Sequence, residues 1–251
     1  MATKDIVLIT GANTGLGLEV VRALCKSSNA YEIIVGSRSV EKGEEAVATI
    51  KKEHPQTTST LSVLQADVSS DDSIQNAVDT VSSRFGKVDV LINNAGAGFD
   101  GEIQSGKLGL REGFNKSWDT NVSGTHVMTT LFMPLLLKSS NPRLMFVTSG
   151  TSALAETECF DNPMFQRLNA SPAKGWPKEQ MINPITSYRS TKTGLNMLMR
   201  EWTRILREDG VKVWAISPGF LATGLGGMGP EQLKKVSTGC LVAVCSGRIA
   251  K

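Results

Sequence analysis

The sequence predicts a single doubly wound α/β domain over residues 1–251, with a mostly parallel sheet of six or seven strands. Short apolar runs rich in β-branched residues alternate with longer amphipathic stretches, which is the pattern of a parallel sheet covered by helices on both faces. Right-handed crossovers then favour the doubly wound arrangement. No internal repeat, low-complexity tract or linker divides the chain, so one domain with one large core is expected.

The expected elements follow one another in regular order. The predicted strands are 6–9, 33–35, 61–64, 88–92, 144–147 and 211–216. Between the first four strands lie the helical patterns 15–28, 40–53 and 71–85. In the first of these, Leu16, Val20, Ala23 and Leu24 share one face, as expected for a helix that packs on a sheet.

Two segments interrupt the alternation. Residues 97–117 form a glycine-rich stretch after the fourth strand, and residues 150–183 are polar and contain Pro163, Pro172 and Pro177. Both follow the carboxyl ends of strands, where long loops shape the binding crevice of doubly wound folds. We therefore expect ligand-binding loops at both places.

Composition excludes several classes of function. The net charge is only +3 and no run of five or more basic residues occurs, so nucleic acid is not expected as a partner. The apolar stretch 131–137 is too short to cross a bilayer, and no signal peptide precedes the first strand, so no membrane attachment is expected. The four cysteines form no Cys-x-x-Cys and meet no histidine cluster, which predicts no metal site and free thiols in the cytoplasm.

A glycine-rich turn joins the first strand to the first helix. It reads Thr10-Gly-Ala-Asn-Thr-Gly-Leu-Gly17. Glycines allow a sharp turn and close approach of a ligand, and the helix N-terminus offers free N–H groups to a phosphate. The pattern predicts a dinucleotide-binding, Rossmann-type unit; the alternative is a tight turn without a ligand.

Tyr188 precedes Lys192 by four residues on a helix-like segment. Such positions lie roughly 6 Å apart on one helix face. A nearby ammonium favours phenolate and lowers the pKa of the tyrosine, which suits proton transfer to a carbonyl oxygen or from an alcohol. Ser149 follows the fifth predicted strand, and Thr148, Thr151 and Ser152 are neighbouring hydroxyls, so this segment offers hydrogen-bond donors for such an oxygen.

These motifs together resemble the short-chain dehydrogenase/reductase family over about residues 5–225. Gly-x-x-x-Gly-x-Gly in the turn is followed in family order by Asp67-Val68, Asn93-Asn-Ala-Gly96, Asn121, Ser149, Tyr188-x-x-x-Lys192 and Pro218-Gly-x-x-x-Thr223. The resemblance implies that Asn121, Ser149, Tyr188 and Lys192 are catalytic. It implies a cofactor site of Gly11, Asn13, Thr14, Gly15, Leu16, Gly17, Ser37, Arg38, Asp67, Val68, Asn94, Ala95, Gly96, Tyr188, Lys192, Pro218, Gly219 and Thr223.

The second strand favours NADP(H) over NAD(H). NAD sites place an acidic residue at the end of this strand to bind the ribose 2′-hydroxyl, whereas NADP sites place an arginine nearby. Here the strand ends Val35-Gly-Ser-Arg38, so Ser37 is expected to donate to a 2′-phosphate and Arg38 to pair with it. The alternative for Arg38 is a solvated surface residue.

The chain departs from the family pattern in two places. Ser149 and Tyr188 are 39 positions apart, far more than in most members. The extra residues resemble the insertion of monomeric carbonyl reductases, which favours a monomer or dimer over a tetramer. Apolar side chains there are expected to wall the substrate pocket and to suit a bulky or aromatic carbonyl: Phe160, Met164, Phe165, Leu168 and Trp176. Residues 224–251 are atypical; 241–244 are a candidate seventh strand.

The sequence thus predicts an NADPH-dependent reductase that converts a ketone or aldehyde to an alcohol, with the reverse oxidation possible. Tyr188 supplies the proton and the nicotinamide supplies the hydride. Two alternatives are an NAD-linked alcohol or steroid-type dehydrogenase and a non-catalytic dinucleotide-binding sensor protein.

Overall fold

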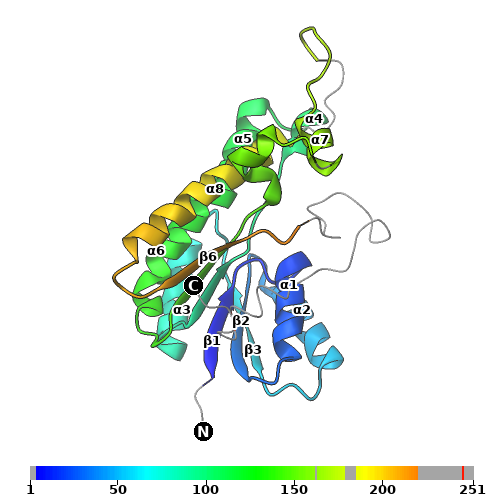
Figure 1. Cartoon of the computed structure of the whole chain (residues 1–251). Helices are drawn as coiled ribbons and strands as arrows, with labels where there is room; N and C mark the ends of the chain where they lie inside the picture. The colour runs from blue at the N-terminus through cyan, green and yellow to red at the C-terminus, as the bar shows by residue number, and fades with distance from the viewer. Residues whose placement is uncertain (1–3, 162, 179–184, 220–244, 246–251) are drawn as a thin grey trace.

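The computed structural model describes residues 4–161, 163–178, 185–219 and 245. Six strands form one parallel sheet in the order β3-β2-β1-β4-β5-β6 (Figure 1). Their bounds are β1 Asp5–Ile9, β2 Tyr31–Ser37, β3 Thr60–Gln65, β4 Val90–Asn93, β5 Arg143–Val147 and β6 Lys212–Ile216. The predicted doubly wound α/β fold is therefore confirmed. The strand order reverses between β1 and β4, so a crevice is expected at the carboxyl ends of these two strands.

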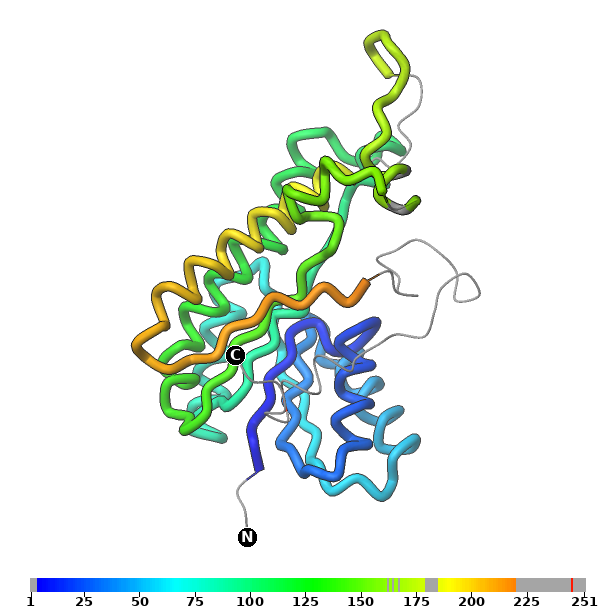
Figure 2. The backbone as a smooth tube through the Cα atoms, viewed as in Figure 1, coloured from blue at the N-terminus to red at the C-terminus, as the bar shows by residue number. Residues whose placement is uncertain are grey.

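Helices cover both faces of the sheet (Figures 1 and 2). Helices α1 (Gly15–Cys25) and α2 (Val40–Glu53) pack on one face, and α3 (Asp71–Phe85), α6 (Gly124–Leu136) and α8 (Thr186–Ile205) pack on the other. Alternate residues of β1 serve the two cores: Val7 and Ile9 belong to one cluster and Leu8 to the other. Because both faces are buried, the strands are almost continuously apolar.

Local signals set the helix ends. Helices α2 and α3 have the predicted bounds, and their N-termini are capped by Ser39 and Ser70, whose hydroxyls accept hydrogen bonds from backbone N–H groups of the first turn. Gly86 ends α3 in the left-handed conformation, with φ of 72°. Helix α1 ends at Cys25, three residues before the predicted end.

The expectation of a loop over 97–117 was wrong, because this segment contains two helices. They are α4 (Asp100–Gln104) and α5 (Leu110–Trp118), and a π-helical turn, η1 (Asp119–Ser123), joins α5 to α6. A Cβ on Gly113 would lie 2.4 Å from Cγ1 of Ile103. This glycine therefore allows α4 and α5 to approach closely, so its role is helix packing rather than loop formation.

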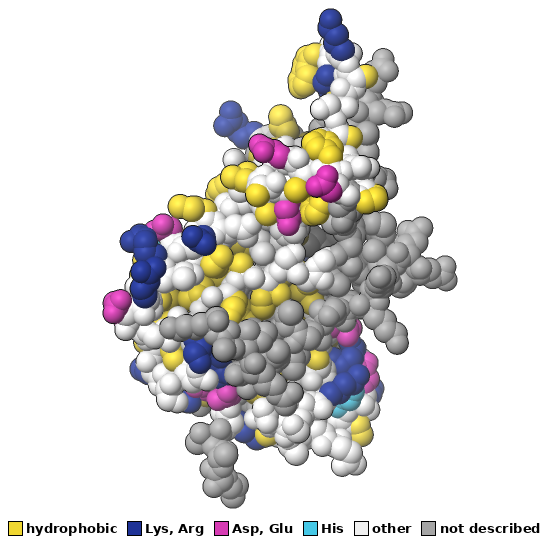
Figure 3. Space-filling view, viewed as in Figure 1, with side chains coloured by type: hydrophobic (Ala, Val, Ile, Leu, Met, Phe, Trp, Pro, Cys, Tyr) yellow, Lys and Arg dark blue, Asp and Glu magenta, His cyan; other side chains and the backbone are white. Residues whose placement is uncertain are grey.

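The segment after β5 projects beyond the sheet (Figure 2). It contains the short helical turns η2 (Gly150–Ser152) and η3 (Leu154–Glu158) and helix α7 (Pro163–Asn169). Trp176, in the same segment, is 89% exposed. On the face shown in Figure 3, Lys and Arg side chains occur in several separate groups. Within the described part of the chain, every helix is too short or too polar to span a bilayer.

Candidate active site

Three of the predicted catalytic side chains surround the segment that follows β4. The Asn121 carboxamide is fully buried, accepts the Ala97 N–H at 2.8 Å and donates to the Ala97 carbonyl at 2.7 Å. Its nitrogen also donates to Thr191 Oγ1 at 2.9 Å. Asn121 therefore joins this segment to α8, and its place in the π turn η1 gives the side chain this direction.

Lys192 lies beside the same segment and is only 3% exposed. Its Nζ donates a hydrogen bond to the Val147 carbonyl at 2.9 Å, at the end of β5. A Cβ on Gly96 would lie 3.1 Å from Asn121 Oδ1 and 3.2 Å from Lys192 Nζ, so the glycine makes room for both groups. Burial lowers the pKa of Lys192 to about 8.

Tyr188 lies one helical turn before Lys192, whose Nζ is 5.8 Å from the centre of the phenol ring. The ring packs on Gly98, where a Cβ would lie 3.4 Å from Tyr188 Cδ2. Burial raises the pKa of the phenol, and hydrogen bonding with Ser149 lowers it in part. The expectation that Lys192 lowers this pKa therefore needs correction: burial dominates, and the ammonium donates to Val147 instead.

Ser149 is the N-cap of η2. Its Oγ accepts the Thr151 N–H at 3.2 Å and shares a hydrogen bond with Thr151 Oγ1 at 2.9 Å. The rival hydroxyls of Thr148, Thr151 and Ser152 are all less than 9% exposed. Ser149 is half-buried and, of the four, it is the one whose hydroxyl lowers the pKa of Tyr188, so it remains the best-placed.

The glycine turn forms a cradle beside these groups. Gly11 and Gly15 have φ of 61° and 55°, which favour glycine. A Cβ on Gly17 would lie 2.6 Å from Asn94 Nδ2 and 2.7 Å from the Gly11 carbonyl oxygen. Among the described residues, Thr14 at the N-cap of α1 makes no side-chain capping bond. The turn and the helix N-terminus thus fit a pyrophosphate.

Asn94 and Ala95 hold the cradle against β4. The Asn94 Nδ2 donates to the carbonyls of Thr10 at 2.8 Å and Gly11 at 3.1 Å. The N–H groups of Asn94 and Ala95 both donate to Thr10 Oγ1, at 3.0 and 2.9 Å. These two residues, which directly follow β4, therefore hold the start of the turn in place through their hydrogen bonds. Leu16 is buried in the core beneath the cradle, and Asn13 is half-buried within it.

The expectation that Ser37, at the end of β2, donates a hydrogen bond to a 2′-phosphate needs correction. Its side chain is 1% exposed and its hydroxyl donates to the Ser39 carbonyl at 2.8 Å, so it is not a free donor for a phosphate. Arg38 is exposed. Asp67 Oδ1 accepts hydrogen bonds from the N–H and Oγ of Ser69, at 3.0 and 2.7 Å.

Three further predicted cofactor-site residues, Val68, Pro218 and Gly219, lie in the described part of the chain. The carbonyl oxygen of Val68 would lie 1.9 Å from a Cβ on Gly124, so the residue after Asp67 packs directly on the start of α6. After β6, Pro218 is half-buried and Gly219 has φ of 79°. Thr223 and the candidate strand 241–244 lie outside the described residues.

The predicted pocket wall is not formed as expected. Trp176 and Phe160 are 89% and 52% exposed, whereas Phe165 and Leu168 are half-buried; the side chain of Met164 lies outside the described residues. The apolar content of 150–183 did not reveal which side chains face inward, because this segment has little regular periodicity.

Sequence reasoning also missed Arg189, which fastens the insertion to α8. Its Nε donates to the Thr151 carbonyl at 2.8 Å, and its terminal nitrogens reach the Leu168 carbonyl at 3.4 Å and Asn169 Oδ1 at 3.3 Å. A cavity of about 390 Å³ is lined by Arg189, Leu168 and the hydroxyl-bearing residues Thr151, Thr157, Thr186, Ser190 and Thr193. The residue after Tyr188 therefore connects the catalytic helix to the insertion.

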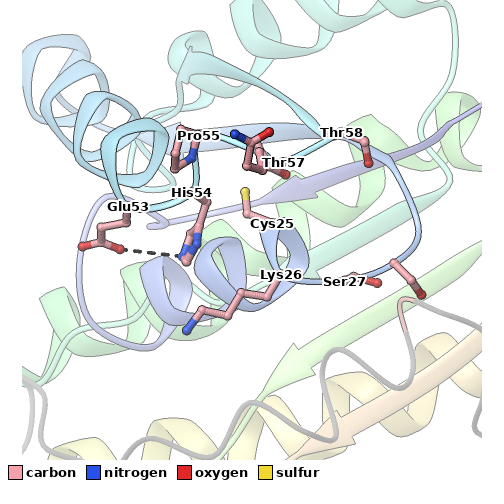
Figure 4. Close-up of a pocket in the computed structure, with 10 residues that line it drawn as sticks. Cys25, Lys26, Ser27, Glu53, His54, Pro55, Thr57 and Thr58 are labelled. Carbon is pink, nitrogen blue, oxygen red and sulfur yellow. Dashed lines mark ion pairs between the residues drawn. The ribbon is translucent and has the colours of Figure 1, made fainter.

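A second cavity, of about 440 Å³, lies at the C-terminal ends of α1 and α2, away from the predicted site (Figure 4). Cys25 and His54 line it, and His54 lies 3.9 Å from the Glu53 carboxylate. Burial raises the pKa of the Cys25 thiol, so it is a poor nucleophile. In the described part of the chain, no cluster of His, Cys, Asp or Glu has the arrangement of a metal site.

The fold and the cradle define a class of protein: a dinucleotide-binding protein with a doubly wound sheet. The sequence profile of the short chain dehydrogenase family matches residues 5–159. A short-chain dehydrogenase/reductase, tropE, from Talaromyces stipitatus is 43% identical over 226 residues, which is 90% of this chain and 82% of that protein. Another, eupG from a Phoma species, is 45% identical over 249 residues, or 97% of this chain and 87% of that protein.

A solved structure agrees with these sequence matches. The NADPH-bound carbonyl reductase from chicken fatty liver has a TM-score of 0.69 and 25% identity, and the match covers 90% of this chain and 84% of that one. The chain belongs to the short-chain dehydrogenase/reductase family. It is therefore an oxidoreductase that acts on CH–OH or C=O groups with a nicotinamide dinucleotide.

Proposed function

We propose that this protein is an NADPH-dependent reductase that converts a ketone or aldehyde to an alcohol. The observation that carries the proposal is the convergence of Asn121, Tyr188 and Lys192 on the segment 96–98. The Ser149 hydroxyl is close enough to Tyr188 to lower the pKa of the phenol in part. The reverse oxidation uses the same groups. The likeness to the NADPH-bound chicken carbonyl reductase supports this direction and this cofactor.

Each side chain has one role in this proposal. The nicotinamide, when bound, supplies the hydride. Tyr188 donates its phenolic proton to the carbonyl oxygen, and the raised pKa of the phenol keeps it protonated at neutral pH. The Ser149 hydroxyl donates a hydrogen bond to the same oxygen as negative charge develops there. Lys192 stabilises the phenolate that remains, and Asn121 holds the 96–98 segment and α8 together.

The cofactor site is proposed to use the residues that the sequence pointed to. The backbone of Gly11 to Gly17 binds the pyrophosphate, Asp67 and Val68 border the adenine, and Lys192 binds the nicotinamide ribose. Arg38 pairs with the 2′-phosphate, since it is exposed at the end of β2 and no acidic residue occupies positions 36–38. Ser37 contributes to this loop through its bond to Ser39 rather than by contacting the phosphate.

The remaining features of the proposal concern the substrate and the state of the protein. We propose a bulky or aromatic carbonyl substrate, because Arg189 joins the insertion to α8 at the residue after Tyr188. We propose one domain over the whole chain, a monomer or dimer in solution, and a reducing compartment such as the cytoplasm. Free thiols at Cys25, Cys159 and Cys245 agree with that compartment.

The direct test follows NADPH consumption with a panel of ketones, aldehydes and quinones. Tyr188→Phe should lose nearly all turnover, roughly 10²–10⁴-fold in kcat, because the phenylalanine has no proton to donate. NADPH binding, measured by fluorescence titration, should remain close to that of the wild type. A variant that keeps most of its rate would reject Tyr188 as the proton donor. No turnover of any substrate by the wild type would favour the non-catalytic sensor.

The choice of cofactor is tested in the same assay with Arg38→Ala. The KM for NADPH should rise far more than the KM for NADH, because only NADPH carries the 2′-phosphate. Arg84→Ala, which removes an exposed arginine near the end of α3, serves as the matched control. Equal changes for the two cofactors would defeat the assignment of Arg38.

A further inference from the structure

Asp100 is a buried carboxylate that is distant in sequence from α8, the helix of Tyr188 and Lys192, but forms hydrogen bonds with that helix. It is the first residue of α4 and is 8% exposed. Its Oδ1 accepts the Ser187 N–H at 2.8 Å, and its Oδ2 accepts the Tyr188 N–H at 3.0 Å. Both carboxylate oxygens are therefore hydrogen-bonded to the first turn of α8.

Among the described residues, this carboxylate takes the place of an N-cap side chain for α8, because the N-cap residue itself makes no side-chain hydrogen bond. The first N–H groups of an α-helix have no partner within the helix, and an Asp, Ser, Thr or Asn at the N-cap usually accepts from them. At the N-cap of α8 stands Ile185, whose side chain has no hydrogen-bonding group. Asp100, which lies 87 positions before Ser187 in the chain, supplies the acceptor instead.

The contacts of Asp100 continue a series made by the preceding residues. Gly96 borders Asn121 and Lys192, Ala97 exchanges two hydrogen bonds with Asn121, and Gly98 packs on the Tyr188 ring. Asp100 then binds the backbone of Tyr188 itself. One short segment thus holds the side chains of three proposed catalytic residues and the main chain of one of them.

We propose that Asp100 is a positioning residue for proton transfer, which fixes the backbone of Tyr188 and thereby the place of its phenol relative to Ser149 and Lys192. This inference rests on the proposed function of Tyr188. Its physical basis is that a displacement of about 1 Å at a reacting group can reduce the rate by about 10²-fold. The glycine cradle lies on other elements, so cofactor binding should depend on Asp100 much less than turnover does.

The experiment compares Asp100→Ala and Asp100→Asn with Asp89→Asn. Asp89 is a suitable control because it is also a buried aspartate that accepts a backbone N–H, at 2.9 Å from Ile6, but at the amino ends of the strands. Asp100→Ala should lose about 10²-fold in kcat with less than a few-fold change in the dissociation constant of NADPH. Asp100→Asn, which keeps one acceptor oxygen, should fall between Ala and wild type. Asp89→Asn should keep kcat per folded molecule.

Two results would overturn the proposal. The first is an Asp100→Ala variant whose kcat lies within about two-fold of the wild-type value. The second is an Asp89→Asn variant that loses as much kcat as Asp100→Ala when the two variants have the same melting temperature. Hydrogen–deuterium exchange over residues 185–192 provides a readout that does not depend on turnover. Exchange should accelerate there in Asp100→Ala and not in Asp89→Asn. If the wild type turns over no carbonyl, the proposed function fails; unchanged exchange would then reject the positioning role as well.

Discussion

At the scale of single residues, burial decides the proton affinities at the site. A lysine four residues from a tyrosine suggests that charge lowers the tyrosine pKa, yet the structure places the phenol in surroundings that raise it and the ammonium in surroundings that lower its own pKa to about 8. Both shifts have the same cause, since removal from water disfavours the charged form of either group. The free enzyme thus holds a protonated phenol beside a lysine that ionises near physiological pH.

The pKa of Lys192 leads to a pH prediction. A lysine with a pKa of about 8 is charged below that pH and neutral above it. The charged form favours the phenolate and attracts the anionic cofactor, so kcat/KM for NADPH should fall as pH rises through about 8. Initial rates between pH 6 and 10 test this. In Lys192→Arg the guanidinium stays charged, so the decrease in kcat/KM should move above pH 10. A decrease that stays near pH 8 in this variant would have to be assigned to another group.

At the scale of elements, the turn between β1 and α1 is the part most closely adapted to a ligand. Gly17 has no space for a side chain, because a Cβ there would meet Asn94 Nδ2, the Gly11 carbonyl and Ala12 Cα within 2.8 Å. Two of these three contacts are with the backbone of the turn itself. A side chain at this position would therefore deform the cradle rather than only crowd a neighbour.

Gly17→Ala should accordingly weaken NADPH binding strongly, by at least about 10-fold, with some loss of stability of about 1–3 kcal/mol from overpacking. Gly109→Ala is the matched control, because its added Cβ has no neighbour within 4 Å and its φ is −65°. Fluorescence titration with NADPH and thermal melting measure the two effects. Wild-type affinity in Gly17→Ala would show that the turn does not hold the cofactor as proposed.

The π turn η1 is the element that sequence patterns missed most clearly. None of the helical ranges predicted from the sequence includes Asn121, and the structure joins α5 to α6 through five π-helical residues that include it. Such turns are frequent at functional sites, because an extra residue redirects one side chain. Here the redirected carboxamide reaches both Ala97 and Thr191.

At the scale of the whole molecule, the two ends of the sheet serve different purposes. The carboxyl ends of the strands carry the cradle and the proposed catalytic groups. The amino ends carry buried charges that join distant segments: Arg143 donates to the Asp5 carboxylate and to the Cys245 carbonyl, both at 2.5 Å. Asp89 joins β1 to the segment before β5, since it accepts hydrogen bonds from the Ile6 N–H and the Ser139 hydroxyl.

Asp89 should therefore stabilise the fold in a pH-dependent way. Burial raises the pKa of its carboxyl, but hydrogen bonds from Ile6 and Lys87 outweigh burial, so the pKa lies below its usual value. A depressed carboxyl pKa contributes stability above the unfolded value, near 4, that is lost as pH falls through the folded pKa. Asp89→Asn should cost about 1–3 kcal/mol at pH 7, and urea unfolding should show the difference shrinking below about pH 4. A constant difference would contradict an ionic role.

The sequence alone determined the fold class, the order of the strands along the chain and the family. Apolar runs and amphipathic stretches are local patterns, and helices 40–53 and 71–85 could be bounded to the residue because Ser39, Ser70 and Gly86 are local end signals. The motifs around Gly11, Asn121, Ser149 and Tyr188 likewise have fixed spacing within single elements. Such information is readable without knowing what each segment packs against.

Only the tertiary structure decided how these groups act on one another. The pKa shifts of Tyr188 and Lys192 come from burial by several elements, and the cap of α8 comes from Asp100, on a different helix. The same holds for Ser37, whose hydroxyl is already bonded to Ser39, and for Trp176, which is exposed rather than in the pocket wall. Burial and long-range hydrogen bonds depend on residues distant in the chain, so a local sequence pattern does not contain them.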